Sequence, residues 1–135
     1  MEVIRMTQQV LQAINEGDAE TYMKMVDPDM TSFEPEAIGN MVTDTACFHR
    51  FYLDLTAKRE FPKRSIILHP TVYLLGENAA CIAYVRLTQF IDTRTGQACS
   101  KQAEETRLWL RKNGVWLNVH THRSNNTQPS TSHCD

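Results

Sequence analysis

Four strand-like runs, separated only by short turns, fill the second half of the chain and restrict the folds open to it. The runs are SIILHPTVYLLG, AACIAYVRLTQFI, ACSKQAEETRLWLR and VWLNVHTHR, between residues 65 and 123. Turn residues join consecutive runs, in GEN, DTRTGQ and KNG, which predicts an antiparallel meander. Because each strand is about ten residues or longer, the sheet must twist and curve. A curved sheet with helices on one side encloses a concave space.

The first half of the chain is predicted to supply those helices. Apolar residues recur at helical spacing from residue 2 to 16, and Gly17 is a typical helix stop. Asp18 can cap a second short helix, which ends before Pro28. The other predicted elements are a short strand over 30–34 and a third helix from residue 43 or 44 to 60. The predicted fold class is α+β, a cone in which N-terminal helices pack on a curved antiparallel sheet.

A single domain accounts for most of the length. A chain of 135 residues can bury about two-thirds of its unfolded surface around one core. We assign residues 1–124 to this domain. The remainder, 125–135, reads NNTQPSTSHCD. It is polar and has no periodicity, so we expect a disordered tail.

Charge and composition exclude several classes of partner. Fourteen basic and sixteen acidic residues give a formal charge of -2, which is too balanced for a surface that binds nucleic acid or membrane through charge. No signal-peptide core is visible, and no apolar run reaches the length of about 18 residues that spans a membrane. The four cysteines lie far apart without a C-x-x-C pair, and two fall inside strand-like runs. These features predict a reduced, cytoplasmic protein.

Alternation along a strand assigns polar residues to faces. The last run divides into two sets that face opposite ways, namely Val115, Leu117, Val119, Thr121 and Arg123 on one side and Trp116, Asn118, His120 and His122 on the other. The histidine pair and Arg123 are therefore not expected to serve one site. By the same rule Arg86 shares an otherwise apolar or aromatic face with Tyr84, and Arg107 shares a face with Glu105.

Arg86 is the most informative residue, because a guanidinium keeps its charge when buried and needs a partner. One interpretation is a structural ion pair with a glutamate of the same chain. The glutamates considered are Glu34, Glu36, Glu104 and Glu105. The other interpretation is that Arg86, Arg107 and Arg123 converge from three strands on the cavity of the sheet and hold an acidic group. The residues alone leave both open.

Metal binding and catalysis have weaker support. His120 and His122 could supply two zinc ligands, but a structural site needs about four and a catalytic site about three plus water, so we expect no metal and no cofactor. The chain has no phosphate-binding glycine loop and no hydrolase, metalloprotease or kinase signature. A small isomerase or dehydratase would need an acid–base group in a dry pocket. Its candidates are His49, Glu34 and Glu105.

Several segments together resemble a known family. They are FEPEAIGN (33–40), FHRFY (48–52), ACIAYVRLTQFID (80–92), EETRLW (104–109) and WLNVHTHRS (116–124). These segments closely resemble the C-terminal association, or hub, domain of calcium/calmodulin-dependent protein kinase II, and the resemblance runs in order from Glu2 to Ser124. It implies a nuclear transport factor 2-like cone.

The resemblance implies a non-catalytic domain. Hubs of this family assemble a calmodulin-binding serine/threonine kinase into two stacked rings, usually a dodecamer or tetradecamer. The expected partners are further copies of the chain, the kinase and regulatory segment of the parent protein, and a small carboxylate or acidic peptide in the cavity. The alternatives are a small cavity enzyme and a carboxylate- or peptide-binding module of the same fold.

The resemblance also names cavity residues. The family's cavity arginines match Arg86, Arg107 and Arg123, and Tyr22 and His49 match positions near its mouth or wall. The segment LDLTAKREFPKRS departs from the family pattern, since it is one residue shorter and lacks a tryptophan that many relatives have there. The outer rim of the pocket, and any ligand preference that depends on it, therefore do not carry over.

Overall fold

Two helices open the chain, as the apolar spacing predicts. The computed structural model describes residues 2–38, 40–43, 49–50, 53–54 and 63–125. Helix α1 (Glu2–Glu16) ends at Gly17, whose φ of 69° is easily adopted only by glycine. Helix α2 (Ala19–Met25) begins after Asp18, whose carboxylate accepts a 3.1 Å hydrogen bond from the backbone amide of Thr21. The predicted cap is confirmed.

Six strands form one sheet. They are β1 (Val26–Phe33), β2 (Met41–Val42), β3 (Arg64–Leu74), β4 (Ala79–Ile91), β5 (Ala98–Lys112) and β6 (Val115–Asn125), with a short 3-10 helix, η1 (Pro35–Ala37), between β1 and β2. Their order across the sheet is β2-β1-β6-β5-β4-β3. Strands β3 to β6 form the predicted antiparallel meander.

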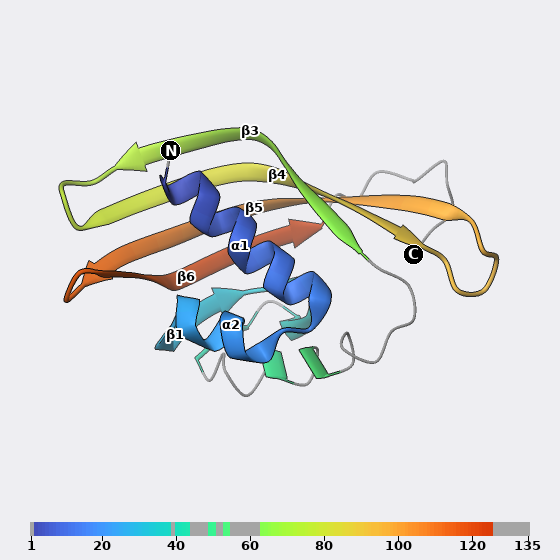
Figure 1. Cartoon of the computed structure of the whole chain (residues 1–135), viewed down its shortest axis with the longest axis horizontal. Helices are drawn as coiled ribbons and strands as arrows, with labels where there is room; N and C mark the ends of the chain where they lie inside the picture. Colours follow the sequence, from blue (N-terminus) through green and yellow to red (C-terminus); the bar gives the residue numbers. More distant parts are fainter. Residues whose placement is uncertain (1, 39, 44–48, 51–52, 55–62, 126–135) are drawn as a thin grey trace.

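The helices lie across one face of the curved sheet (Figure 1). The hydrophobic core lies between the helices and this face of the sheet. Its largest fully buried apolar side chains are Trp109, Tyr22, Leu11, Met30, Ile82 and Val10. In α1 the buried residues Val3, Met6, Val10 and Ala13 fall three or four positions apart, a spacing that keeps them on one side of a helix. The face of the sheet under the helices therefore carries the core.

Strand β1 differs from its prediction. It begins at Val26 rather than Met30, and it runs parallel to β6, while the sequence had indicated only a short strand of unassigned pairing. The pairing is irregular between Val26 and Thr31, on either side of Pro28, which has no amide hydrogen to donate. The parallel pairing joins two strands that lie far apart in the sequence, so no local pattern predicts it.

A β-bulge in β6 changes which of its residues face the same side of the sheet, so the alternation predicted for that strand is wrong in part. The register with β5 shifts between Leu108 and Trp109, so that Asn118 pairs with Trp109 and His120 with Leu108. The extra residue turns Asn118 and Thr121 to the same face, where both are buried. Asn118 was predicted on the histidine face, and that assignment is wrong. Arg123 and the histidines remain on opposite faces, as expected.

The third predicted helix and the tail fall largely outside the described residues. His49, Arg50, Leu53 and Asp54 are helical, and the rest of 43–60 is not described. Asn125, the first residue of the predicted tail, ends β6, and 126–135 are not described.

Two further sequence predictions concern the state of the cysteines and the absence of a membrane-spanning segment. Cys81 is free, whereas Cys99 is disulfide-bonded. Within the described ranges, no helix combines the length and the apolar character that a membrane crossing requires.

Candidate functional site

A row of polar residues crosses the helix-covered face of the sheet. Tyr84 of β4 lies directly opposite Glu105 of β5, and Glu105 lies directly opposite Arg123 of β6. Arg86 and Arg107 stand two residues further along their strands, on the same face as the row. The meander thus brings the three arginines predicted from sequence to one part of the sheet, around a glutamate.

Glu105 is the centre of the first cluster. We call Glu105, Arg86, Arg107 and Tyr84 the Glu105 cluster. The carboxylate lies 3.1 Å from Arg86 Nη1 and 3.5 Å from Arg107 Nη2, and accepts a 2.5 Å hydrogen bond from the Tyr84 hydroxyl. Burial by itself raises the pKa of this carboxyl, but the charges of both arginines and the Tyr84 hydrogen bond lower the pKa to about 2.

The low pKa of Glu105 predicts a loss of stability in acid. The folded-state pKa of about 2 lies below the ordinary value of 4.5, so the stabilisation is complete above about pH 4.5 and is lost as the pH falls towards 2. The difference corresponds to roughly 3 kcal/mol. We expect the free energy of unfolding, measured at several pH values between 6 and about 3, to fall more steeply for the wild type than for Glu105→Gln. Equal slopes would contradict this account.

Arg107 is held by neutral oxygens as well as by Glu105. Its Nε donates to Tyr84 at 3.0 Å, and its Nη1 donates to Asn118 Oδ1 at 2.7 Å and to Thr121 Oγ1 at 3.1 Å. The amide nitrogen of Asn118 in turn donates to the backbone carbonyls of Leu108 and His120. Asn118 therefore bridges the bulge and fixes the guanidinium, which a side chain on the other face could not do.

Arg86 is tied to the first helix and to the edge strand. Its Nε donates to Ser65 Oγ at 3.0 Å and its Nη2 to Asn15 Oδ1 at 3.1 Å. Asn15 also donates to Ser65 Oγ at 2.8 Å. With the Glu105 contact, all three nitrogens of the Arg86 guanidinium have a partner. The ion-pair interpretation of Arg86 is thus the one observed, with Glu105 as the glutamate.

A second cluster lies beside the first. We call Glu34, His49, Tyr22 and Arg123 the Glu34 cluster. Glu34 Oε2 accepts a 2.5 Å hydrogen bond from His49 Nε2, and Oε1 lies 3.6 Å from Arg123 Nη2. The other ring nitrogen of His49 contacts the Tyr22 hydroxyl, and burial raises the pKa of that phenol, so it keeps its proton. Burial raises the pKa of the Glu34 carboxyl, but His49 and then Arg123 bring it below its usual value.

The five residues predicted for the cavity therefore divide between two clusters. Arg86 and Arg107 belong to the Glu105 cluster, and Arg123, His49 and Tyr22 belong to the Glu34 cluster. Their binding of an external acidic group stays a prediction. Tyr84 and Asn118 were not predicted as site residues. Tyr84 was predicted to lie on an apolar or aromatic face. The alternation of polar and apolar residues in the last strand gives no sign of the bulge that turns Asn118 inward.

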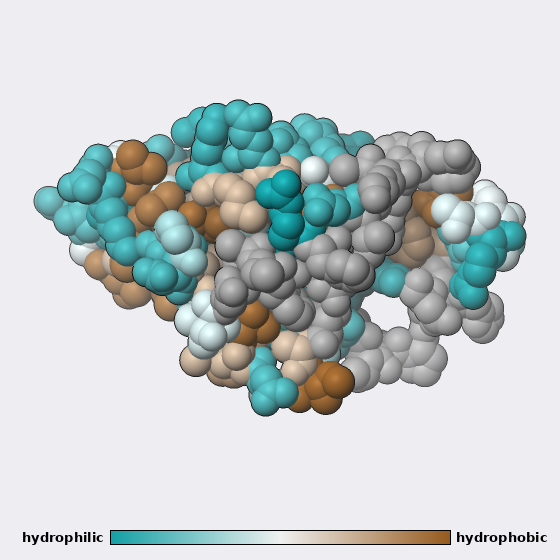
Figure 2. Space-filling model, turned by 90° about the horizontal axis from the view of Figure 1, so that it is seen from below, coloured by the Kyte–Doolittle hydropathy of each residue, from teal (hydrophilic) through white to brown (hydrophobic). Residues whose placement is uncertain are grey.

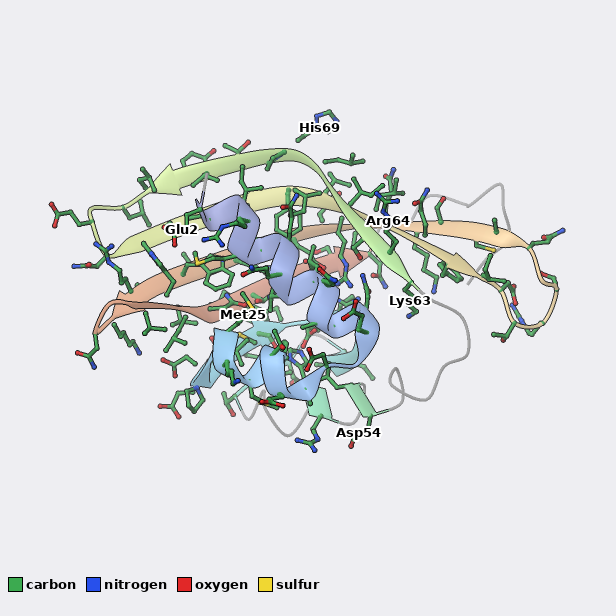
Figure 3. The ribbon with its side chains drawn as sticks, viewed as in Figure 1. Glu2, Met25, Asp54, Lys63, Arg64 and His69 are labelled. Atoms are coloured by element: carbon green, nitrogen blue, oxygen red, sulfur yellow. The ribbon has the colours of Figure 1, made fainter. Side chains whose placement is uncertain are left out.

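The histidines of β6 lie on the other face. His120 Nδ1 is 2.7 Å from Thr31 Oγ1, and the ring of Phe33 contacts the rings of His120 and His122. His69 projects away from the sheet at the edge strand β3 (Figure 3). In the part of the chain that the structure describes, no three histidine, cysteine or acidic side chains come close enough to hold a metal ion.

The described surface has two hollows near the sheet. One, of about 490 Å³, is lined by residues of β3 to β6 that include His69, Thr71 and Glu104, together with Tyr84 and Glu105 of the Glu105 cluster. The other, of about 520 Å³, includes Arg64 and Phe90 near one end of the sheet. The lining of neither hollow includes Arg86, Arg107 or Arg123.

Comparison with known proteins identifies the family. The family model described as calcium/calmodulin dependent protein kinase II association domain matches residues 1–127. The calcium/calmodulin-dependent protein kinase type II subunit delta of Oryctolagus cuniculus is 52% identical over 124 residues, which are 91% of this chain and 23% of that protein. The association domain of C. elegans CaMKII is 46% identical, with a TM-score of 0.83 over 92% of this chain and 93% of that one.

A more distant structure shows the fold alone. A nuclear transport factor 2-like superfamily protein from Salmonella enterica is 17% identical, with a TM-score of 0.74 over 99% of this chain and 95% of that one. This likeness confirms the predicted nuclear transport factor 2-like fold. The family match over residues 1–127 includes every helix and strand that the structure describes in this chain. The chain belongs to the association (hub) domain family of calcium/calmodulin-dependent protein kinase II.

Proposed function

We propose that this chain is the non-catalytic hub of a cytoplasmic calcium/calmodulin-dependent serine/threonine kinase. In this proposal it assembles the parent protein into two stacked rings of twelve or fourteen subunits in total. The observation that carries it is the 52% identity to the delta subunit over 91% of this chain. The chain spans only 23% of the length of that relative, so the kinase and its regulatory segment are proposed partners that lie outside this sequence.

Assembly needs apolar surface that a single chain leaves exposed. The exposed large apolar residues fall in two groups, Tyr73, Leu74, Leu75 and Val115 near the β3–β4 and β5–β6 turns, and Phe33, Ile38 and Met41 around η1. Figure 2 shows hydrophobic residues among polar ones at the end that carries the two turns. Both groups are candidates for contacts between copies.

The two tryptophans are poor candidates for those contacts. Trp109 is fully buried within the single chain, so it belongs to the core. Trp116 packs partly against the core and lies under the Arg111 guanidinium, 5.4 Å from the ring centre. This leaves the exposed aliphatic residues as the better candidates.

The proposed mechanism is proximity. Kinase domains tethered to one hub by flexible linkers would meet at effective concentrations that reach about the millimolar range for short linkers. Phosphorylation of one kinase by its neighbour would then depend little on the bulk concentration. The hub itself would supply no chemical step.

We also propose that the arginine-containing face receives an acidic group, either a small carboxylate or an acidic peptide. Charge-assisted hydrogen bonds from arginine suit such a ligand. Support comes from the side chains of the Glu34 cluster, where Arg123 and His49 already hold a carboxylate of the chain itself. The proposed ligand would carry the same group, a carboxylate, that Glu34 presents to Arg123 and His49.

Electron-microscope images of the purified domain test the ring proposal. We expect round particles with a central hole in one view and two layers in the side view. Ring particles with one layer would contradict the proposed stacking of two rings but would still support assembly into a ring. Small particles without a ring would contradict the hub function.

A further inference from the structure

Two histidines of β6 lie in line with apolar residues on the face of the sheet opposite the helices. Met41 of β2 pairs with Phe33 of β1, and Phe33 pairs with His122 of β6. The ring of Phe33 contacts the rings of His120 and His122, with centroid distances of 5.7 and 5.4 Å. We call Phe33, Met41, His120 and His122 the Phe33 patch. The patch joins apolar surface to groups that change their charge near neutral pH.

The Phe33 patch is open to solvent in the single chain. Phe33, Met41 and His122 are exposed, and His120 is partly exposed. Ile38, which follows η1, adds a large apolar side chain that is 88% exposed. Exposed apolar residues that gather on one part of a surface are typical of a contact with another molecule.

A second copy of the chain is the partner that this surface fits best. Two stacked rings need two unlike contacts, because neighbours within a ring join different patches and subunits of facing rings join the same patch. The exposed large apolar residues that the structure describes fall into two groups, and the group around η1 contains Phe33 and Met41. The patch has no charge while its histidines are neutral, so two copies can bury it without burying a charge.

The residues that pair with the two histidines are uncharged. They are Thr31 and Phe33 on β1, and Leu108 and Thr106 on β5. Two positions before Thr31 and Thr106 stand Asp29 and Glu104, and both are exposed. Glu36 lies on η1, which also contacts β6. His69 and Glu104 line the hollow that His122 also lines, so the charges around the patch are those of exposed groups beside it.

Protonation changes what the patch can bury. Burial, and then the charge of His122, lowers the pKa of His120 below its ordinary value of 6.5, so the His120 ring is neutral at pH 7. Its Nδ1 lies 2.7 Å from Thr31 Oγ1, and a neutral ring can accept a hydrogen bond there, whereas a protonated ring only donates. A second copy would remove water from both rings, which further disfavours their charged forms.

We propose that the Phe33 patch contacts a second copy of the chain, and that protonation of His120 and His122 releases this contact. This inference rests on the proposed hub function. Assembly is complete while both rings are neutral, and it weakens as the pH falls below the pKa of the histidines in the separate chain. The contact loses about tenfold in affinity for each pH unit and for each histidine that must give up a proton. The loss of stability expected from Glu105 begins only below about pH 4.5, so the two effects occur in different pH ranges.

Sedimentation velocity of the full chain, at one micromolar concentration and between about pH 7.5 and about pH 5.5, measures the release. The wild type is expected to form large species at the upper pH and smaller species at the lower pH, with the same circular dichroism spectrum at both. The double variant His120→Gln/His122→Gln stays uncharged and is expected to remain assembled in acid. His69→Gln is the matched control, because His69 is an exposed histidine outside the patch. This control is expected to dissociate like the wild type.

Labelling of the wild type locates the contact without any variant. Diethyl pyrocarbonate acylates neutral, accessible histidines, and mass spectrometry of the peptides shows which of them have reacted. His122 and His69 are both exposed in the single chain. In the assembled protein at about pH 7, we expect His122 to react much more slowly than His69, because a second copy covers only His122.

The outcomes separate this inference from the hub function beneath it. Assembly that persists in the wild type at the lower pH would overturn the release by protonation, and so would equal dissociation of the wild type and the double variant. Equal labelling of His122 and His69 in large species would overturn the contact at the Phe33 patch. Each of these results would leave the hub function standing, whereas the absence of large species at every pH would overturn both proposals.

Discussion

Glu105→Ala is expected to lower the free energy of unfolding by about 3–5 kcal/mol. The carboxylate is fully buried and lies between Arg86 and Arg107. Its removal leaves two largely buried guanidinium groups without a counter-ion, and a guanidinium cannot escape by losing its proton. Because domains are stable by only about 5–15 kcal/mol, the loss would be a large share of the total.

Urea denaturation followed by circular dichroism measures the effect. All proteins must be compared at one concentration, since assembly would otherwise shift the apparent stability. Glu104→Ala provides a control that also removes one glutamate from β5, but from an exposed position on the opposite face, and it should change the free energy of unfolding by less than about 0.5 kcal/mol. A similar small effect from Glu105→Ala would mean that the buried carboxylate does not stabilise its arginines.

Asn118→Ala is expected to lower the free energy of unfolding by about 2–4 kcal/mol, because several buried polar groups lose a partner. Asn118 is fully buried at the bulge of β6. Its side chain accepts from Arg107 and Thr121, and donates to the carbonyls of Leu108 and His120. The substitution therefore removes one hydrogen bond from each of these buried groups, while Arg107 and Thr121 keep the hydrogen bond between them.

The same denaturation experiment tests Asn118, with Asn125→Ala as the control. Asn125 is exposed at the end of β6, so its loss should change the free energy of unfolding by less than about 0.5 kcal/mol. If Asn118→Ala unfolds at the same urea concentration as the wild type, the hydrogen bonds across the bulge are not a major source of stability.

Local patterns were sufficient to predict much of this fold. Apolar spacing located α1, and the Asp18 cap located the start of α2, because both signals act within a few residues. Short turns between long strand runs predicted the meander for the same reason. The alternation that grouped Arg86 with Tyr84, and Arg107 with Glu105, holds because the pairing of β4 with β5 is regular throughout.

The remaining features depend on contacts that local patterns do not encode. The parallel pairing of β1 with β6 joins residues about ninety positions apart, as Thr31 and His120 illustrate. The bulge of β6 reversed the predicted face of Asn118 by adding one residue to the strand. Sequence reasoning offered four glutamates for Arg86 and could not choose Glu105, because the choice depends on register. The free state predicted for cysteines inside strands holds for Cys81 but not for Cys99.

Native mass spectrometry of the purified chain at micromolar concentration tests the hub function most directly. The chain has a mass of 15.5 kDa, so twelve copies give about 186 kDa and fourteen copies about 217 kDa. We expect one of these species, or both, to dominate the spectrum. A spectrum dominated by a monomer or dimer would contradict the assembly function proposed for this domain.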